Sequence, residues 1–237
     1  DNYYGNEMYA LSLNTLSMSR ITDPGLPVTC KSGDVGCCVA AIANGTQPNS
    51  RHIYDGLAYI PDLDKMWIFS GVMACQPGWA QADTWLFNFA TLTWERKYPS
   101  GPIPSGIYGN VAAYDNNTRL IFLHNLYAFY SYNPTTNAYA LLRGSVGIDY
   151  HMTSVIDPVR KKFVIIGGGQ QWVYDISAGS SYTRQSLGST GGSAVVNADY
   201  PGLAYDPVSD RIVAWVGGNT VYILNMDSKQ WTSVTYS

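Results

Sequence analysis

The chain has 237 residues, a formal net charge of −3 and only 13% charged residues, and these values already exclude several classes of protein. No cluster of Lys and Arg offers the basic surface that binding to nucleic acid requires. No apolar run approaches the roughly 20 residues of a membrane-spanning helix, so neither a nucleic-acid partner nor a membrane span is expected. Aromatic residues reach 14%, with 23 Gly and 12 Pro, which favours strands and tight turns over helices.

The first predicted element is a short hairpin from Glu7 to Thr22, in which apolar and polar residues alternate about a turn at Asn14-Thr15. The same pattern returns four times along the chain, at residues 83–98, 126–142, 171–187 and 220–236. We call these the outer hairpins. The second strand of each carries an early aromatic residue or Met, namely Met18, Trp94, Tyr139, Tyr182 and Trp231.

A second type of hairpin precedes each outer hairpin except the first. These inner hairpins cover residues 56–71, 110–125, 153–169 and 202–218, and they recur at intervals of roughly 40 to 55 residues. They align on Tyr59, Tyr114, Ile156 and Tyr205. The second strand of each is a continuous run of Ile, Val, Phe and Trp, as expected for a strand buried on both faces.

An inner and an outer hairpin together make a four-stranded antiparallel sheet, and repeats of this size are typical of a β-propeller. Gly167-Gly168 and Gly217-Gly218 close the second strand of their units, and an aromatic residue follows on the fourth strand. In these features the chain resembles kelch-type propellers of the galactose-oxidase-like kind, although Ser70-Gly71 and His124-Asn125 replace the Gly-Gly pair in two units. The resemblance implies an all-β propeller of four complete blades and an N-terminal half blade.

The half blade predicts that this propeller is incomplete. The chain ends at Ser237 with the fourth strand of a complete unit, so no strands remain to complete the first one. We therefore expect residues 1–237 to be one domain that is incomplete at both ends, with at least two strands before Asp1 and a further blade after Ser237. By resemblance the whole ring has six or seven blades; alternatively, other chains complete the ring or an assembly.

Antiparallel order places the loop before the first strand and the loop between the second and third strands on one face of every blade. A concave mouth of aromatic and polar residues on that face suits a glycan, because aromatic faces stack on sugar C–H surfaces while polar tips bind hydroxyls. The competing interpretation is that these tyrosines pack against neighbouring blades. The candidate ligand-binding residues are His52, Tyr54, Asp55, Trp79, Tyr108, Asn110, His124, Tyr150, His151 and Tyr200.

The three histidines raise the question of a metal, because imidazole binds Cu, Zn and Fe. The resemblance to galactose oxidase implies a copper-radical site with two His, two Tyr and a Tyr–Cys crosslink. Here, however, His52, His124 and His151 belong to three different units, and no Cys lies beside a tyrosine of the mouth. We therefore assign no metal site, no cofactor and no catalytic residue, with copper as the alternative.

A long loop insert at residues 23–51 separates the first hairpin from the next unit and contains three of the four cysteines, Cys30, Cys37 and Cys38. Cys75 lies in a loop on the same predicted face. Two disulfides are expected, either Cys30–Cys37 with Cys38–Cys75 or Cys30–Cys38 with Cys37–Cys75. The alternative of a zinc site lacks the two CxxC knuckles such sites use.

Disulfides imply an oxidising compartment, and glycosylation sequons at Asn44 and Asn116 agree with it. The sequence therefore predicts a secreted or cell-surface protein. Its expected function is non-enzymatic: binding a glycan or protein, or packing into an assembly, through the face that carries the insert. The alternative is a carbohydrate-active or copper-radical oxidase-like enzyme whose catalytic residues lie partly in missing segments, since fold alone does not select a function.

Overall fold

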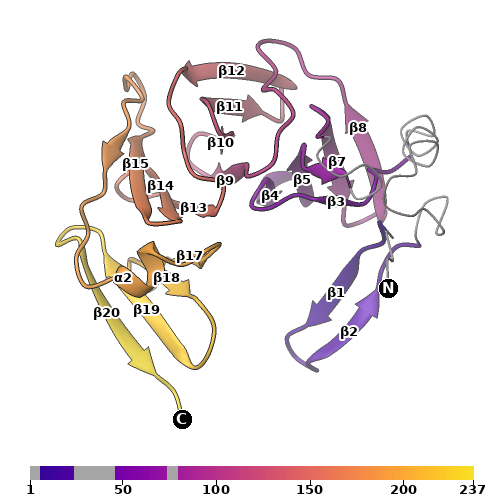
Figure 1. The fold of residues 1–237 in the computed structure, drawn as a ribbon. Coiled ribbons are helices and arrows are strands. Elements are labelled where there is room, and N and C mark those ends of the chain that lie inside the picture. Colours follow the sequence, from indigo (N-terminus) through magenta and orange to yellow (C-terminus); the bar gives the residue numbers. More distant parts are fainter. Residues whose placement is uncertain (1–5, 24–45, 74–79) are drawn as a thin grey trace.

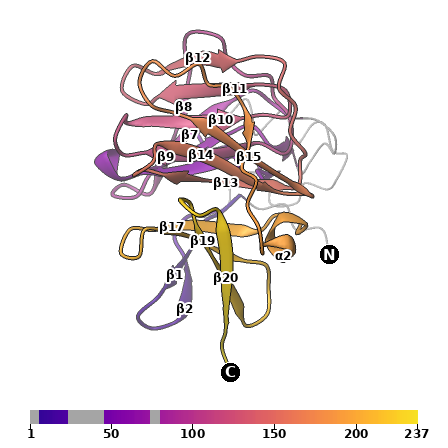
Figure 2. The same ribbon diagram turned by 90° about the vertical axis from the view of Figure 1, so that its left-hand side faces the viewer.

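The computed structural model describes residues 6–23, 46–73 and 80–237, which form an all-β structure of antiparallel sheets. Within these ranges, four sheets have four strands each and two sheets have two strands each. The four larger sheets follow one another along an arc, with the first strand of each on the inside (Figure 1). The first hairpin and the last sheet lie at the two ends of the arc, and both are in the lower part of Figures 1 and 2.

The four larger sheets share one plan, in which the strands follow in chain order from the inner to the outer edge. The first sheet contains β4 (Leu57–Ile60), β5 (Lys65–Phe69), β7 (Thr84–Asn88) and β8 (Thr93–Lys97). The second contains β9 (Val111–Asp115), β10 (Leu120–His124), β11 (Phe129–Asn133) and β12 (Ala138–Arg143). The third contains β13 (Met152–Asp157), β14 (Lys162–Gly167), β15 (Gln170–Asp175) and β16 (Gln185–Ser186). The fourth contains β17 (Gly202–Asp206), β18 (Arg211–Trp215), β19 (Thr220–Asn225) and β20 (Gln230–Thr235).

The second strands are buried on both faces, as their continuous apolar sequences predict. In β14, the four residues from Phe163 to Ile166 are all 0% exposed.

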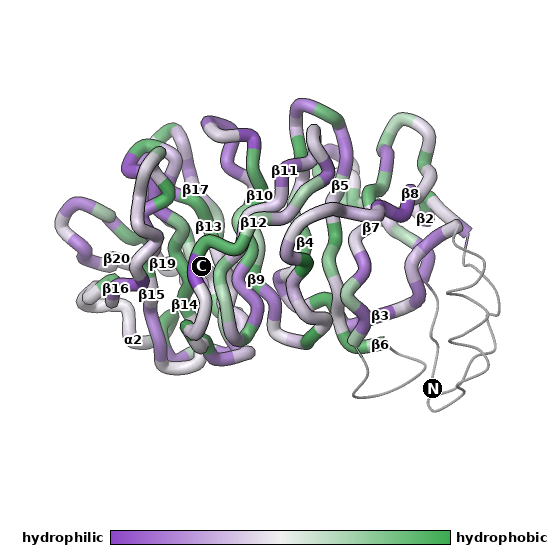
Figure 3. The backbone as a smooth tube through the Cα atoms, turned by 90° about the horizontal axis from the view of Figure 1, so that it is seen from above, coloured by the Kyte–Doolittle hydropathy of each residue, from purple (hydrophilic) through white to green (hydrophobic). Residues whose placement is uncertain are grey.

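Hydrogen bonds to an aspartate stabilise the turn between the two strands of an inner hairpin. The Asp157 carboxylate accepts hydrogen bonds from the backbone N–H groups of Val159 and Arg160, at 3.1 and 3.0 Å. Viewed from above, apolar stretches run along the strands of neighbouring sheets (Figure 3). The alternating and continuous apolar patterns therefore predict the inner hairpins correctly.

The core consists of apolar clusters that lie between consecutive sheets. Trp67 and Phe69 of the first sheet pack with Leu123 and Tyr132 of the second. Two equivalent clusters fill the spaces between the second and third sheets and between the third and fourth. The inner strands are also in contact in the order β4, β9, β13 and β17. Each sheet therefore covers one face of the next.

An arginine also links the third and fourth sheets through carboxylates in the turns of their hairpins. Arg160 donates from Nη1 to Asp157 Oδ2 at 3.0 Å, from Nη2 to Asp210 Oδ2 at 2.7 Å and from Nε to Asp227 Oδ1 at 2.6 Å. The guanidinium holds the pKa of Asp210 at about 2, so this carboxylate stays ionised at neutral pH. This link complements the apolar contacts between the two sheets.

The outer strand of the third sheet differs from its prediction. Tyr182 was expected on this strand, but β16 contains only Gln185 and Ser186, and Tyr182 lies before it with a φ of 50°. A longer turn delays the strand: Ser180 Oγ donates to the Asp175 carbonyl at 2.6 Å and accepts from the Tyr182 N–H at 3.0 Å. The sequence pattern "SAGSSYT" did not reveal this turn.

Other elements were not predicted, and one of them, the short 3₁₀ helix η1 (Pro61–Leu63), lies between β4 and β5. β3 (Arg51–His52) pairs with β6 (Val72–Met73), and a short helix, α2 (Ser193–Val196), precedes β17. β3, β6 and α2 lie at the same end of the sheets (Figure 3). The first hairpin, β1 (Tyr9–Ser12) with β2 (Ser17–Arg20), forms as predicted.

Candidate functional site: an aromatic mouth

Aromatic side chains converge where the chain enters the first strand of each four-stranded sheet. The segments that enter β4, β9, β13 and β17 each contribute at least one ring. We call this group the aromatic mouth. Its members are His52, Tyr54, Tyr108, Tyr150, His151 and Tyr200.

The rings of the aromatic mouth form a closed circuit of neighbours. The centroid of Tyr54 lies 5.7 Å from that of Tyr200, which lies 5.4 Å from that of His151. His151 lies 3.7 Å from Tyr150, which lies 5.7 Å from Tyr108. A distance of 6.4 Å between Tyr108 and Tyr54 closes the circuit. Side chains from all four sheets therefore meet at one place, as antiparallel order predicts.

Backbone strain accompanies two of these tyrosines. Tyr54 and Tyr200 have φ values of 61° and 54°, in the left-handed region that side-chain-bearing residues rarely adopt. Gly109 holds the equivalent position of the second sheet at a φ of 68°, and an added Cβ there would lie 2.5 Å from the Cβ of Tyr150. Glycine thus makes room for Tyr150, whereas the other two positions keep a tyrosine despite the strain. Strained residues are often found at functional sites.

A cavity of about 460 Å³ opens beside the Tyr54–Tyr200 pair. His52 stacks on Tyr54 at 3.9 Å, and Asp55 and Thr153 also line the cavity. Its size is within the range of small-ligand pockets. The cavity therefore combines ring faces with a few polar groups.

Several polar groups of the aromatic mouth remain available to a ligand. Asp149 Oδ1 accepts hydrogen bonds from the His151 N–H at 2.8 Å and from Nδ1 at 2.6 Å, which leaves Nε2 free of that contact. Within the described residues, no hydrogen bond engages the hydroxyls of Tyr54 and Tyr200. Burial, followed by neighbouring phenols, raises the pKa of Tyr200 to about 12. Burial also raises the pKa of Tyr54, so both phenols stay neutral and can donate as well as accept.

Asp55 lies beneath the aromatic mouth and joins three sheets. Its Oδ2 accepts from the N–H and Oγ of Ser154 in β13, at 2.8 and 2.7 Å, and its carbonyl accepts from the Ala112 N–H in β9 at 2.9 Å. Burial raises the pKa of Asp55 to about 7, although the hydrogen bonds from Ser154 act in the opposite direction. Asp55 thus holds the inner strands together below the tyrosines.

Two predicted ligand residues lie away from the aromatic mouth. His124 is fully buried, with Nε2 2.8 Å from the Tyr174 hydroxyl, and burial lowers its pKa to about 4. Asn110 is also fully buried, and its Nδ2 donates to the Ile107 carbonyl at 2.7 Å. Both side chains are therefore enclosed by the protein, although Asn110 Oδ1 has no hydrogen-bond partner among the described residues.

Other sequence-based assignments lie outside the described residues. These are Trp79, the sequon residue Asn44 and the four cysteines Cys30, Cys37, Cys38 and Cys75. The second sequon residue, Asn116, is exposed in the turn between β9 and β10. Across residues 6–23, 46–73 and 80–237, no three His, Cys, Asp or Glu side chains gather into a group that could hold a metal ion.

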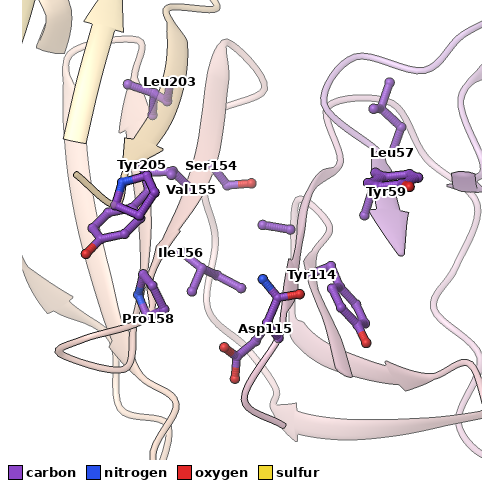
Figure 4. A pocket seen from close by; sticks show the side chains of 14 residues that line it. Leu57, Tyr59, Tyr114, Asp115, Ser154, Val155, Ile156, Pro158, Leu203 and Tyr205 are labelled. Atoms are coloured by element: carbon purple, nitrogen blue, oxygen red, sulfur yellow. The ribbon is translucent and has the colours of Figure 1, made fainter. Parts of the chain in front are cut away.

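The repeat alignment did not anticipate a second cavity, of about 480 Å³, along the inner strands β4, β9, β13 and β17 (Figure 4). Its lining includes Tyr59, Tyr114, Ile156 and Tyr205, the four residues on which the inner hairpins align. The sequence signal was therefore present as a repeated tyrosine. Nothing in the pattern indicated that these side chains surround a common space.

Comparison of the sequence with protein-family models finds no matching family, and comparison with curated proteins finds no match. In the part of the chain that the structure describes, no helix has the length and apolar character needed to cross a membrane.

Proposed function

We propose that this chain is part of a kelch-like β-propeller that binds a glycan at the aromatic mouth and is displayed outside the cell without enzymatic activity. The observation that carries the proposal is the circuit of rings from all four sheets beside a cavity of about 460 Å³. Sugars present apolar C–H faces and many hydroxyls. Rings with free hydroxyls complement both features.

The propeller is supported by apolar faces at the two ends of the arc. In the fourth sheet, the cross-strand pair Leu224 and Trp231 is 0% and 6% exposed. The equivalent pair in the first hairpin, Leu11 and Met18, is 51% and 65% exposed. Trp215 in β18 is 54% exposed, whereas its equivalent in β14, Ile166, is fully buried. Further sheets of the same kind would cover both faces, as each sheet of the arc covers the next.

This part of the proposal predicts that the native protein contains more sheet than the present chain. The intact mass of the deglycosylated polypeptide is expected to be well above 26.0 kDa. Oxidative footprinting of the native protein should then show Trp215 and Met18 protected. A native mass of 26.0 kDa with both side chains fully reactive would contradict the closed propeller.

The glycan site predicts that Tyr54→Gly with Tyr200→Gly weakens binding without unfolding the protein. Each aromatic contact contributes about 1 kcal/mol, so losing both is expected to lower affinity by roughly tenfold or more. Glycine relieves left-handed strain of about 1 kcal/mol per position, which offsets lost packing. The melting temperature should therefore stay within a few degrees of the wild-type value.

Glycan affinity of this double variant is measured by titration calorimetry, with the exposed Tyr98→Ala, outside the aromatic mouth, as control. If the double variant lost stability as well as affinity, these tyrosines would be residues that pack between the sheets and not residues that bind a glycan. The alternative of an oxidase-like enzyme predicts stoichiometric copper in the native protein, which elemental analysis measures directly.

A further inference from the structure

The second cavity differs chemically from the aromatic mouth. It lies along the inner strands, and Tyr59 and Tyr114 face it from one side while Tyr205 faces it from the other (Figure 4). Pro158 and Leu203 add an apolar surface on the side of Tyr205. We call this space the tyrosine cavity. Its rings remain accessible, and Tyr59 is 49% exposed.

All three tyrosines donate their hydroxyl protons to carboxylates at the turns of the inner hairpins. The Tyr59 hydroxyl lies 2.9 Å from Asp64 Oδ1, and the Tyr205 hydroxyl lies 2.8 Å from Asp210 Oδ1. The Tyr114 hydroxyl lies 3.2 Å from Asp62 Oδ2 in the neighbouring sheet. An ionised carboxylate has no proton to give, so each phenol must be the donor. The phenol oxygens can then only accept hydrogen bonds from a ligand.

The charges around the tyrosine cavity also favour a ligand that donates hydrogen bonds. Arg119 pairs with Asp62 at 3.1 Å, and Arg160 binds Asp210, so these cations are already engaged. Among the described residues, Asp64 has no cationic partner within ion-pair distance. The hydrogen bond to Asp64, followed by burial and the charge of the same carboxylate, raises the pKa of Tyr59. In the aromatic mouth, by contrast, the described hydroxyls of Tyr54 and Tyr200 donate to no carboxylate.

We propose that the tyrosine cavity binds an organic cation that carries N–H donors, such as the guanidinium group of an arginine side chain. The ring faces attract the cation through their quadrupoles, the phenol oxygens accept its hydrogen bonds, and the carboxylates bound to these phenols add a favourable negative potential. Because the carboxylates are exposed and screened by water, binding is weak, with a dissociation constant on the order of millimolar. This site is independent of the glycan site at the other end of the inner strands.

The test is a titration of the full chain, labelled with ¹³C in its tyrosine rings, with N-acetyl-arginine amide, followed by NMR. The resonances of Tyr59, Tyr114 and Tyr205 are expected to shift in a saturable manner. The neutral isostere N-acetyl-citrulline amide should shift them at least several-fold less. Equal shifts with both probes, or no shift with the arginine probe, would overturn the proposal.

Asp64→Asn tests the charge with little change in structure. Asn retains the oxygen that accepts from Tyr59, and it tolerates the φ of 48° found at this position. The variant is expected to bind the arginine probe at least threefold more weakly, while Tyr127→Phe, outside the cavity, binds as the wild type does. Unchanged affinity in Asp64→Asn, with its tyrosine spectrum otherwise intact, would also contradict the proposal. Glycan binding at the aromatic mouth should be the same in both variants.

Discussion

Asp83→Ala is expected to destabilise the protein by about 3–5 kcal/mol, because it leaves a buried guanidinium without its counter-ion. The side chains of Arg51 and Asp83 are only 2% and 3% exposed. Arg51 Nη2 donates to Asp83 Oδ2 at 3.0 Å, and Nη1 donates to Oδ1. The same carboxylate accepts from Trp85 Nε1 at 2.8 Å, so the substitution also leaves a buried indole N–H unpaired.

Urea unfolding at neutral pH measures this loss as a lower midpoint with an unchanged slope. The matched control is the double variant Arg51→Met with Asp83→Leu, which removes both charges and keeps side-chain volume. It should recover a large part of the lost stability, because buried ion pairs are often replaceable by apolar residues. A loss below about 1 kcal/mol in Asp83→Ala would show that water reaches the pair.

The pH dependence of stability is expected to contain two large and opposing contributions. The first comes from His124, whose pKa is about 4 in the folded protein and about 6.5 when unfolded. Between these values the unfolded chain binds the extra proton. The contribution of neutral His124 to the free energy of unfolding is therefore fully present above pH 6.5. It falls by up to roughly 3 kcal/mol as the pH drops towards 4.

Asp55 changes the pH dependence of stability in the opposite direction. Its pKa is about 7 in the folded protein and 3.8 ordinarily, so the folded protein holds the extra proton between these values. Stability from this group is complete below pH 3.8 and is lost as the pH rises through 7, by at most about 4 kcal/mol. In the wild-type protein the two contributions offset each other over much of this range.

Single variants separate the two contributions. In Asp55→Asn, stability should rise with pH between about 4 and 6.5, since the opposing contribution of Asp55 is gone and that of His124 remains. In His124→Gln, stability should fall with pH between about 4 and 7. Urea midpoints at several pH values give both slopes. Slopes of the same sign in the two variants would contradict the placement of these groups.

Much of the fold could be predicted from the sequence because strand patterns are local. The continuous apolar run from Phe163 to Ile166 indicates a strand covered on both faces, and that is what β14 is. The pairing of β3 with β6 could not be predicted, since two-residue strands have no period. The delayed start of β16 depends on hydrogen bonds of Ser180 within the preceding turn.

The aromatic mouth could be predicted in part for a topological reason. Antiparallel order alone places Tyr54, His151 and Tyr200 at one end of the sheets. The side-chain direction of His124 follows a different rule: it lies two residues after Phe122 in β10, so both point to the same face of the sheet. Because Phe122 packs in the cluster between the second and third sheets, that alternation would have placed His124 in the core.

The tyrosine cavity escaped prediction because its polarity depends on contacts between turns. Tyr59 and Tyr205 donate to the aspartates five residues later, whereas Tyr114 reaches Asp62 in a neighbouring sheet. Sequence spacing gives no sign of that last contact. A single sequence therefore predicts which residues recur but not which groups remain free for a ligand.

The central claim, that the aromatic mouth binds a glycan, is tested most directly by screening the chain on a glycan array beside Tyr54→Gly with Tyr200→Gly. We predict that the wild type binds at least one class of glycan and that the folded double variant loses this signal. Absence of any wild-type signal, or an equal signal from the double variant, would contradict the claim. The apolar faces at the ends of the arc would then make assembly the leading function.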